Sequence, residues 1–142
     1  MSRWARKVVA WCTVAWLASV GAQEAAYQVR LSTVPISANM QAATTGHGSA
    51  TANLDGRQLS IRGSFEGLQG AATIARLHMG AIMGVRGEVI HELEVEQAPS
   101  GSLSGTIQLS RAEVQALRDG RLYVQIHSES APEGNLWGWL LQ

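Results

Sequence analysis

The chain has 142 residues, eleven basic and eleven acidic side chains, and one cysteine, Cys12. This length fits a single domain whose core is large enough to fold without disulfides. Cys12 lies in residues 1–22, which have the features of a cleaved leader. The expected mature chain therefore has no cysteine, which excludes disulfides, thiolate metal sites and cysteine nucleophiles. The remaining chain has eight arginines, no lysine and eleven acids, a net charge of about −3, which argues against a nucleic-acid partner.

Residues 1–22 have the pattern of a secretory signal peptide. Basic side chains among the first seven residues precede an apolar run at 8–20, and Gly21-Ala22 provides the small residues that a signal peptidase accepts. A run of thirteen residues is shorter than the roughly 20 that a spanning helix needs. Cys12 lies in the middle of the run, away from the position of a lipidated cysteine. We therefore expect cleavage after Ala22, a secreted or periplasmic domain over residues 25–142, and no membrane span after cleavage.

The rest of the chain shows the alternation of β-strands. Tyr27, Val29 and Leu31 alternate with polar residues, a period of two that places one side in a core and the other in water. Asp55-Gly56 is a strong hairpin signal between the segments 49–54 and 57–65. Further strands are expected at 73–78, 89–95, 103–109, 122–127 and 136–141. The pattern predicts eight short strands.

One segment between the last strands predicts a helix. Ser110 and Glu113 have the spacing of a capping box, in which their side chains satisfy free backbone donors at a helix start. Val114 and Leu117 form a short apolar stripe, and Gly120 ends it. Many short strands with glycine-rich turns predict an all-β fold, an antiparallel Greek-key-like β-sandwich or flattened barrel with one short helix covering one end.

Several motifs, in order and spacing, resemble the CHRD domain, the module named after chordin and found in many bacterial secreted proteins. The matching pieces are GLQG at 67–70, ARLHMG at 75–80, GVRGEV at 84–89, SGT at 104–106 and LYVQIH at 122–127. The family's A-H-x-H-x-G element has Arg76 in place of its first histidine, so only His78 matches. The family's final element, G-E-x-R-G-x-L, corresponds to GNLWGWL at 134–140. Its usual acidic and basic residues are replaced here. The resemblance covers nearly all of the mature chain.

The same pieces are similar, more weakly, to the sandwich of copper-zinc superoxide dismutase. That resemblance implies that His78 and His127 occupy the places of copper ligands. Strand alternation puts both histidines on the solvent side of the sheet, where they converge if their strands are neighbours. Imidazole suits copper, zinc and nickel, so a copper or zinc site is one hypothesis for this chain.

The ligand count argues against that hypothesis. Arg76 stands where the enzyme family has a third histidine, and a guanidinium cannot lose its proton to coordinate a metal. Zinc sites usually have four ligands, or three and a water. His47 or Glu133 would complete a set, but nothing in the sequence places either nearby. In the structural alternative, the strand-end histidines bond to backbone carbonyls or carboxylates, and Arg76 makes an ordinary surface contact.

Two apolar features point to binding instead. Met79 and Met83 belong to a loop whose flexible apolar tip would contact a partner, or would pack locally beneath the loop. Trp137 and Trp139 share one side of the last strand. If Leu136 faces the core, both indoles lie outside as an aromatic platform for a sugar or another subunit; with the opposite phase they are core residues.

These observations favour a non-catalytic function. No G-x-S-x-G elbow, phosphate-cradling G-x-x-x-x-G-K loop or H-E-x-x-H helix is present in the sequence. We expect a secreted binding or interaction module without a required cofactor, and the CHRD resemblance implies protein partners outside the cell. Its ligand is an extracellular or periplasmic protein or glycan, with Arg76, Met79, Met83, Trp137 and Trp139 as the candidate surface. The alternative is a copper- or zinc-binding protein that uses His78 and His127.

Overall fold

The computed structural model describes residues 24–35 and 38–142, so the predicted signal peptide lies outside the described residues. These residues form eight strands, one short 3-10 helix and one α-helix. The strands are β1 (Ala25–Thr33), β2 (His47–Asp55), β3 (Gln58–Glu66), β4 (Ala72–Met79), β5 (Glu88–Val95), β6 (Gly101–Gln108), β7 (Leu122–Ser128) and β8 (Leu136–Trp139). The helices are η1 (Ala38–Met40) and α1 (Arg111–Arg118). In the described part of the chain, no helix is long and apolar enough to span a membrane.

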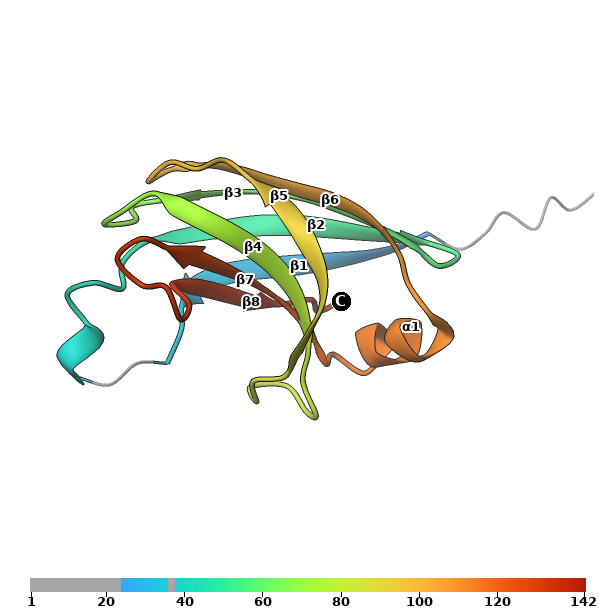
Figure 1. Ribbon diagram of the computed structural model, residues 1–142. Coiled ribbons are helices and arrows are strands. Elements are labelled where there is room, and N and C mark those ends of the chain that lie inside the picture. The colour runs from blue at the N-terminus through green and yellow to red at the C-terminus, as the bar shows by residue number, and fades with distance from the viewer. Residues whose placement is uncertain (1–23, 36–37) are drawn as a thin grey trace, which may run out of the picture.

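The strands close into an antiparallel barrel in the order β1-β2-β3-β6-β5-β4-β7-β8 (Figure 1). The chain passes from β3 to β4 and from β6 to β7 without pairing them, as in a Greek key. Two four-stranded halves, β1-β2-β3-β6 and β5-β4-β7-β8, meet at short seams. Two residue pairs join β5 to β6, and two pairs join β1 to β8. One isolated bridge joins Gln28 of β1 to Leu141, beyond the end of β8. The predicted all-β sandwich or flattened barrel is confirmed.

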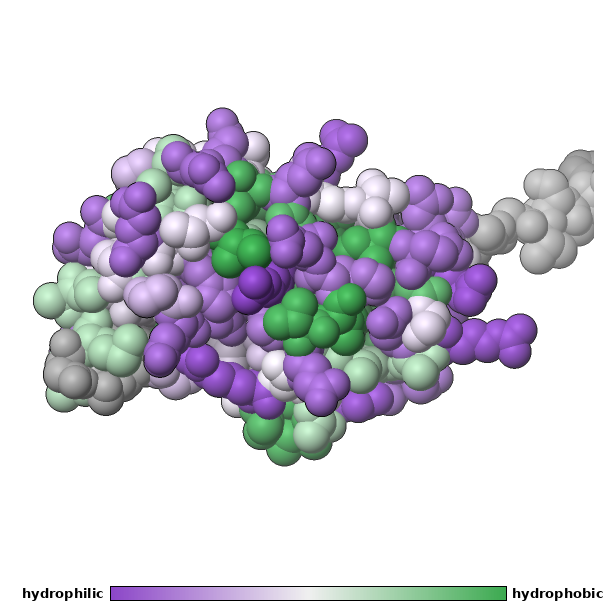
Figure 2. Space-filling view, in the orientation of Figure 1, coloured by the Kyte–Doolittle hydropathy of each residue, from purple (hydrophilic) through white to green (hydrophobic). Residues whose placement is uncertain are grey.

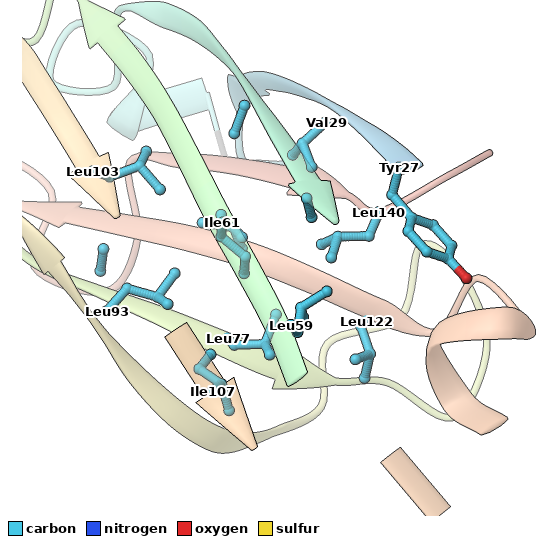
Figure 3. Packing of buried hydrophobic residues seen from close by; sticks show 14 of the residues in the cluster. Tyr27, Val29, Leu59, Ile61, Leu77, Leu93, Leu103, Ile107, Leu122 and Leu140 are labelled. Carbon is cyan, nitrogen blue, oxygen red and sulfur yellow. The ribbon is translucent and has the colours of Figure 1, made fainter. Parts of the chain in front are cut away.

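The core consists of the inward-facing residues of every strand, as the alternation predicts. Tyr27, Val29 and Leu31 of β1 are buried, while the residues between them are exposed. Leu59 and Ile61 of β3 meet them from the same half of the barrel, and the opposite half contributes β4 and β7 side chains (Figure 3). Burying each large apolar side chain stabilises the fold by about 1.5–3 kcal/mol.

Helix α1 begins at the predicted capping box and covers one end of the barrel (Figure 1). The Ser110 side chain accepts a hydrogen bond from the Glu113 backbone N–H, and the Glu113 carboxylate accepts one from the Ser110 backbone N–H. Val114 and Leu117 face inward and are buried. His91 of β5 lies within 3.5 Å of the Glu113 carboxylate, so strand and helix also meet through a polar contact.

The β2–β3 hairpin forms where predicted, but its turn is shifted by one residue. Asp55 pairs with Gln58, so Gly56 and Arg57 make the turn in place of Asp55-Gly56. Gly56 has a φ of +61°, whereas Asp55 stays in the strand. A turn with glycine at its first central position needs positive φ only there, so Asp55 is free to extend the pairing.

Candidate functional site

The outward side chains of β4, β7 and β8 line up in two rows that cross the barrel wall. Antiparallel register places side chains of neighbouring strands directly opposite one another. The first row is Arg76, Gln125 and Trp137, and the second row is His78, Tyr123 and Trp139. We call this surface the outer face of β4-β7-β8. It contains four of the nine candidate residues, Arg76, His78, Trp137 and Trp139.

This outer face is covered, which the sequence did not predict. His78 and His127 point away from the core, as expected, but only 7% and 8% of their surfaces are exposed. Tyr123 and Gln125 are also buried, so β7 is buried on both sides along its whole length. The expectation that the histidines lie on the solvent side is therefore wrong. Two loops, residues 80–87 and 129–135, fold back over the outward side chains of β4 and β7.

The first covering loop, residues 80–87, is fixed by Gly87. The Gly87 N–H donates a hydrogen bond to the Tyr123 hydroxyl over 3.0 Å, and the Gly87 carbonyl lies 3.1 Å from His78 Nδ1. Because a carbonyl can only accept, His78 carries its proton on Nδ1 in this arrangement. A Cβ added at Gly87 would lie 1.8 Å from the Met79 carbonyl oxygen. Glycine is required here because two backbones approach closely.

The second covering loop, residues 129–135, binds β7 through its backbone carbonyls. His127 Nδ1 lies 2.9 Å from the Pro132 carbonyl, and the Gln125 side-chain amide donates to the Glu133 carbonyl over 3.1 Å. Arg86, from the first loop, donates to the same Glu133 carbonyl over 3.3 Å. The two loops therefore meet above the outer face and hold each other in place.

The two histidines are separated along their strands. His127 lies opposite Ile74, four residues before His78 on β4, and Tyr123 lies opposite His78. Four residues of strand separate the two backbone positions by about 13 Å, whereas the ring nitrogens of residues that share one metal ion lie within about 4 Å of each other. Each ring also has its own carbonyl partner, as in the structural alternative. The metal hypothesis remains a prediction that these contacts do not support.

The proposed third ligands do not join the histidines. His47 begins β2, in the other half of the barrel, and its Nε2 lies 3.0 Å from the Glu66 carboxylate on the surface. Glu133 belongs to the second covering loop. Its backbone carbonyl accepts hydrogen bonds from Gln125 and Arg86, and the residue is exposed. No group of three His, Cys, Asp or Glu side chains that could hold a metal occurs among the described residues.

The environment of His78 disfavours its charged form. Burial, the largest cause, lowers the pKa of His78 below its ordinary value of 6.5, and the hydrogen bond to Gly87 opposes this only in part. The nearby His127, Arg76 and Arg86 lower the pKa of His78 further. Its Nε2 is buried and has no hydrogen-bond partner in the described structure. Its imidazole is thus neutral at pH 7.

The tryptophans lie outside the barrel, with the phase that the binding hypothesis requires. Leu136 and Leu140 are fully buried in the core, whereas Trp137 and Trp139 are half-buried on the outer face. The indole centroids are 5.7 Å apart, but their planes are inclined by 69°. The two rings therefore lie side by side outside the barrel and form a corner. We call Trp137 and Trp139 the aromatic corner.

Tyr123 anchors the aromatic corner, a role that the sequence analysis missed. Its ring lies 4.6 Å from Trp139 and 5.6 Å from Trp137, and it stacks on His78 at 4.8 Å with an angle of 14° between planes. Aromatic pairs at such distances contribute about 0.5–1.5 kcal/mol each beyond their buried area. The available signal was its outward phase, in alternation with the apolar Leu122, Val124 and Ile126.

The remaining candidate residues have different environments. Met79 is partly buried against the core, which supports the local-packing alternative for this residue. Met83 is 56% exposed and, with Ile82 and Val85, forms an apolar tip on the first loop. This loop projects at one edge of the molecule (Figure 2). Arg76 is half-buried in the first row beside Gln125.

Comparison with known proteins gives the family. The family model of the CHRD domain matches residues 27–140, nearly the whole chain, so this protein belongs to the CHRD-domain family. That family generally occurs in secreted and periplasmic proteins. Searches of curated proteins and of solved structures found no significant match. The resemblance noted in the sequence is confirmed at the level of the family.

Proposed function

We propose that this chain is an exported, non-catalytic binding module that holds an extracellular or periplasmic protein or glycan at its aromatic corner. The carrying observation is that Trp137 and Trp139 are half-buried outside the barrel, where Tyr123 fixes their positions. Large aromatic side chains contribute much of the energy of many binding sites. Because these two are held in place, little side-chain freedom is lost when a ligand contacts them.

The loop tip extends the same surface. Gly80, at the base of the first loop, lies so close to Trp139 that an added Cβ would be 3.1 Å from the indole. Ile82, Met83 and Val85 are 63%, 56% and 45% exposed. Exposed apolar side chains next to aromatic ones favour contact with a partner. The loop tip and the aromatic corner therefore form one candidate contact surface.

The proposal is tested through the two tryptophans. After cleavage of the predicted leader, Trp137 and Trp139 are the only tryptophans left, so the intrinsic fluorescence of the mature chain reports directly on this surface. Ligands captured from the exported fraction should change the fluorescence, and Trp137→Ala and Trp139→Ala should each weaken capture. Arg62→Ala, an exposed change on β3 in the other half, is the matched control. Unchanged capture by both tryptophan variants would refute the aromatic corner as the binding surface.

A further inference from the structure

A surface groove runs beside the aromatic corner, along the short seam between β1 and β8. Gln28 and Arg30 of β1 line one side, and Trp139 lines the other. Leu141, which pairs with Gln28 through an isolated bridge, and Gln142 complete the lining. Its volume is about 420 Å³, within the range of about 300–1,000 Å³ that is typical of small-ligand sites. The groove is large enough for a short stretch of a linear ligand.

The lining of the groove combines three kinds of chemistry. The Trp139 indole offers an apolar face to C–H groups, while Gln28 and Gln142 offer amide donors and acceptors to hydroxyl groups. Arg30 offers a planar fork of donors that matches a carboxylate. A pyranose ring with a carboxylate presents all three complementary groups.

The charge of this surface favours an acid over a neutral sugar. Arg30 and Arg76 lie on either side of the tryptophan rows, on β1 and β4. Neither arginine is within 4 Å of a carboxylate in the described part of the chain, although Glu92 is opposite Arg76 in register. Among the described arginines only Arg121 has a carboxylate within 4 Å, so Arg30 and Arg76 are distinguished by their positions on either side of the tryptophans and not by being unpaired. They attract an anionic ligand.

We infer that the groove between β1 and β8 binds an acidic polysaccharide, with one uronate ring against Trp139 and its carboxylate on Arg30. This inference rests on the proposed function and specifies its ligand class. Arg76 lies beyond the aromatic corner and attracts further carboxylates of the same polymer. Because the Arg30 side chain is exposed, its charge contribution declines with added salt.

The test compares two oligosaccharides that differ only in the carboxylate. Calorimetry measures binding of an oligogalacturonate and of its fully methyl-esterified, neutral form by the mature chain. We expect the uronate to bind, and Arg30→Gln to weaken it roughly tenfold, because a charged hydrogen bond is lost. Trp139→Ala should weaken it by a similar factor. Arg62→Gln, exposed on the other half of the barrel, should leave the affinity within about twofold.

Each other outcome refutes a specific part of the argument. Equal affinity for the neutral oligomer, or uronate binding unaffected by Arg30→Gln, overturns the acidic ligand but leaves the proposed binding surface intact. No glycan binding, together with tryptophan-dependent capture of a protein, also overturns the inference and keeps the proposed function. Binding of any ligand that persists unchanged in both Trp137→Ala and Trp139→Ala overturns the two together.

Discussion

The imidazole of His78 lies flat against the phenol ring of Tyr123, and both side chains bind the backbone of Gly87. His78 contacts the Gly87 carbonyl and Tyr123 accepts the Gly87 N–H, so one loop residue satisfies two outward side chains on neighbouring strands. Because Tyr123 also supports both tryptophans, the covering loop and the aromatic corner share one anchor. Changes at this anchor should therefore affect stability and binding together.

The Tyr123 hydroxyl should contribute measurably to stability. Tyr123→Phe keeps the ring that supports the tryptophans but leaves the part-buried Gly87 N–H without its acceptor. The cost of an unsatisfied donor predicts a loss of about 1 kcal/mol in the free energy of unfolding, measured by denaturant titration. Tyr27→Phe is the matched control, since the Tyr27 hydroxyl makes no hydrogen bond to the described residues. Equal effects of the two changes would contradict this role of the hydroxyl.

Stability should decline as the pH falls from 7 toward 5, and His78 should account for part of the decline. Burial keeps the pKa of His78 below 6.5 in the folded chain. In the unfolded chain the same ring takes up a proton near pH 6.5, so acid favours unfolding until the folded-state pKa is also passed. We expect His78→Gln to flatten the free energy of unfolding between pH 7.5 and about 5, above the range where carboxylates titrate.

The matched control for this titration is His47→Gln. His47 is exposed and lies beside Glu66, away from the covering loops. Denaturant unfolding at several pH values should give this variant the same slope over the His78 range as the parent. A His78→Gln chain that kept the full pH dependence of the parent would show that other groups cause the decline.

Much of the fold could be predicted because the alternation of apolar and polar residues is local. Tyr27, Val29 and Leu31 indicate a half-buried strand without any knowledge of its neighbours, and Ser110 with Glu113 indicates a helix start. The shifted β2–β3 turn shows the limit of this reasoning. The residues allow a turn at Asp55-Gly56 or at Gly56-Arg57. Pairing along the whole hairpin decides between the two.

The candidate site was predicted less well because its decisive contacts are distant in sequence. Alternation correctly put His78 on the outside of the barrel and left the phase of Trp137 and Trp139 open. It cannot show what covers an outward residue. The covering contacts join Gly87 to Tyr123, 36 residues apart, and Arg86 to Glu133, 47 residues apart. The separation of His78 and His127 depends on the register in which β4 pairs with β7. The sequence motifs around the two histidines do not specify that register.

Gly87 should be irreplaceable in the covering loop. Its alanine variant would place a Cβ 1.8 Å from the Met79 carbonyl, so the loop must move away from β4 and lose its contacts with Tyr123 and His78. The displaced loop should be cut faster by trypsin after Arg86, since proteolysis follows local opening. Limited proteolysis with mass spectrometry measures this rate.

Gly84→Ala is the control within the same loop. An added Cβ there meets nothing within 4 Å, so it carries only the cost of a left-handed backbone, with a φ of +86°. We expect a smaller increase in cleavage than for Gly87→Ala. If both variants are cut at the parent rate, the close approach of Gly87 to β4 does not hold the loop in place.

Copper and zinc titrations should show that His78 and His127 do not share an ion. The rings have different carbonyl partners, Gly87 and Pro132, and the register separates them by about four residues of strand. Two independent single imidazoles bind a divalent ion far more weakly than a site with three or four ligands. For the mature chain without a histidine tag, calorimetry should therefore detect no tight, stoichiometric uptake, and His78→Ala and His127→Ala should each resemble the parent. His47→Ala, which removes an exposed histidine beside Glu66, accounts for any weak surface binding. A single tight ion in the parent that is lost in both single variants would contradict the separation of the rings and restore the metal-binding hypothesis.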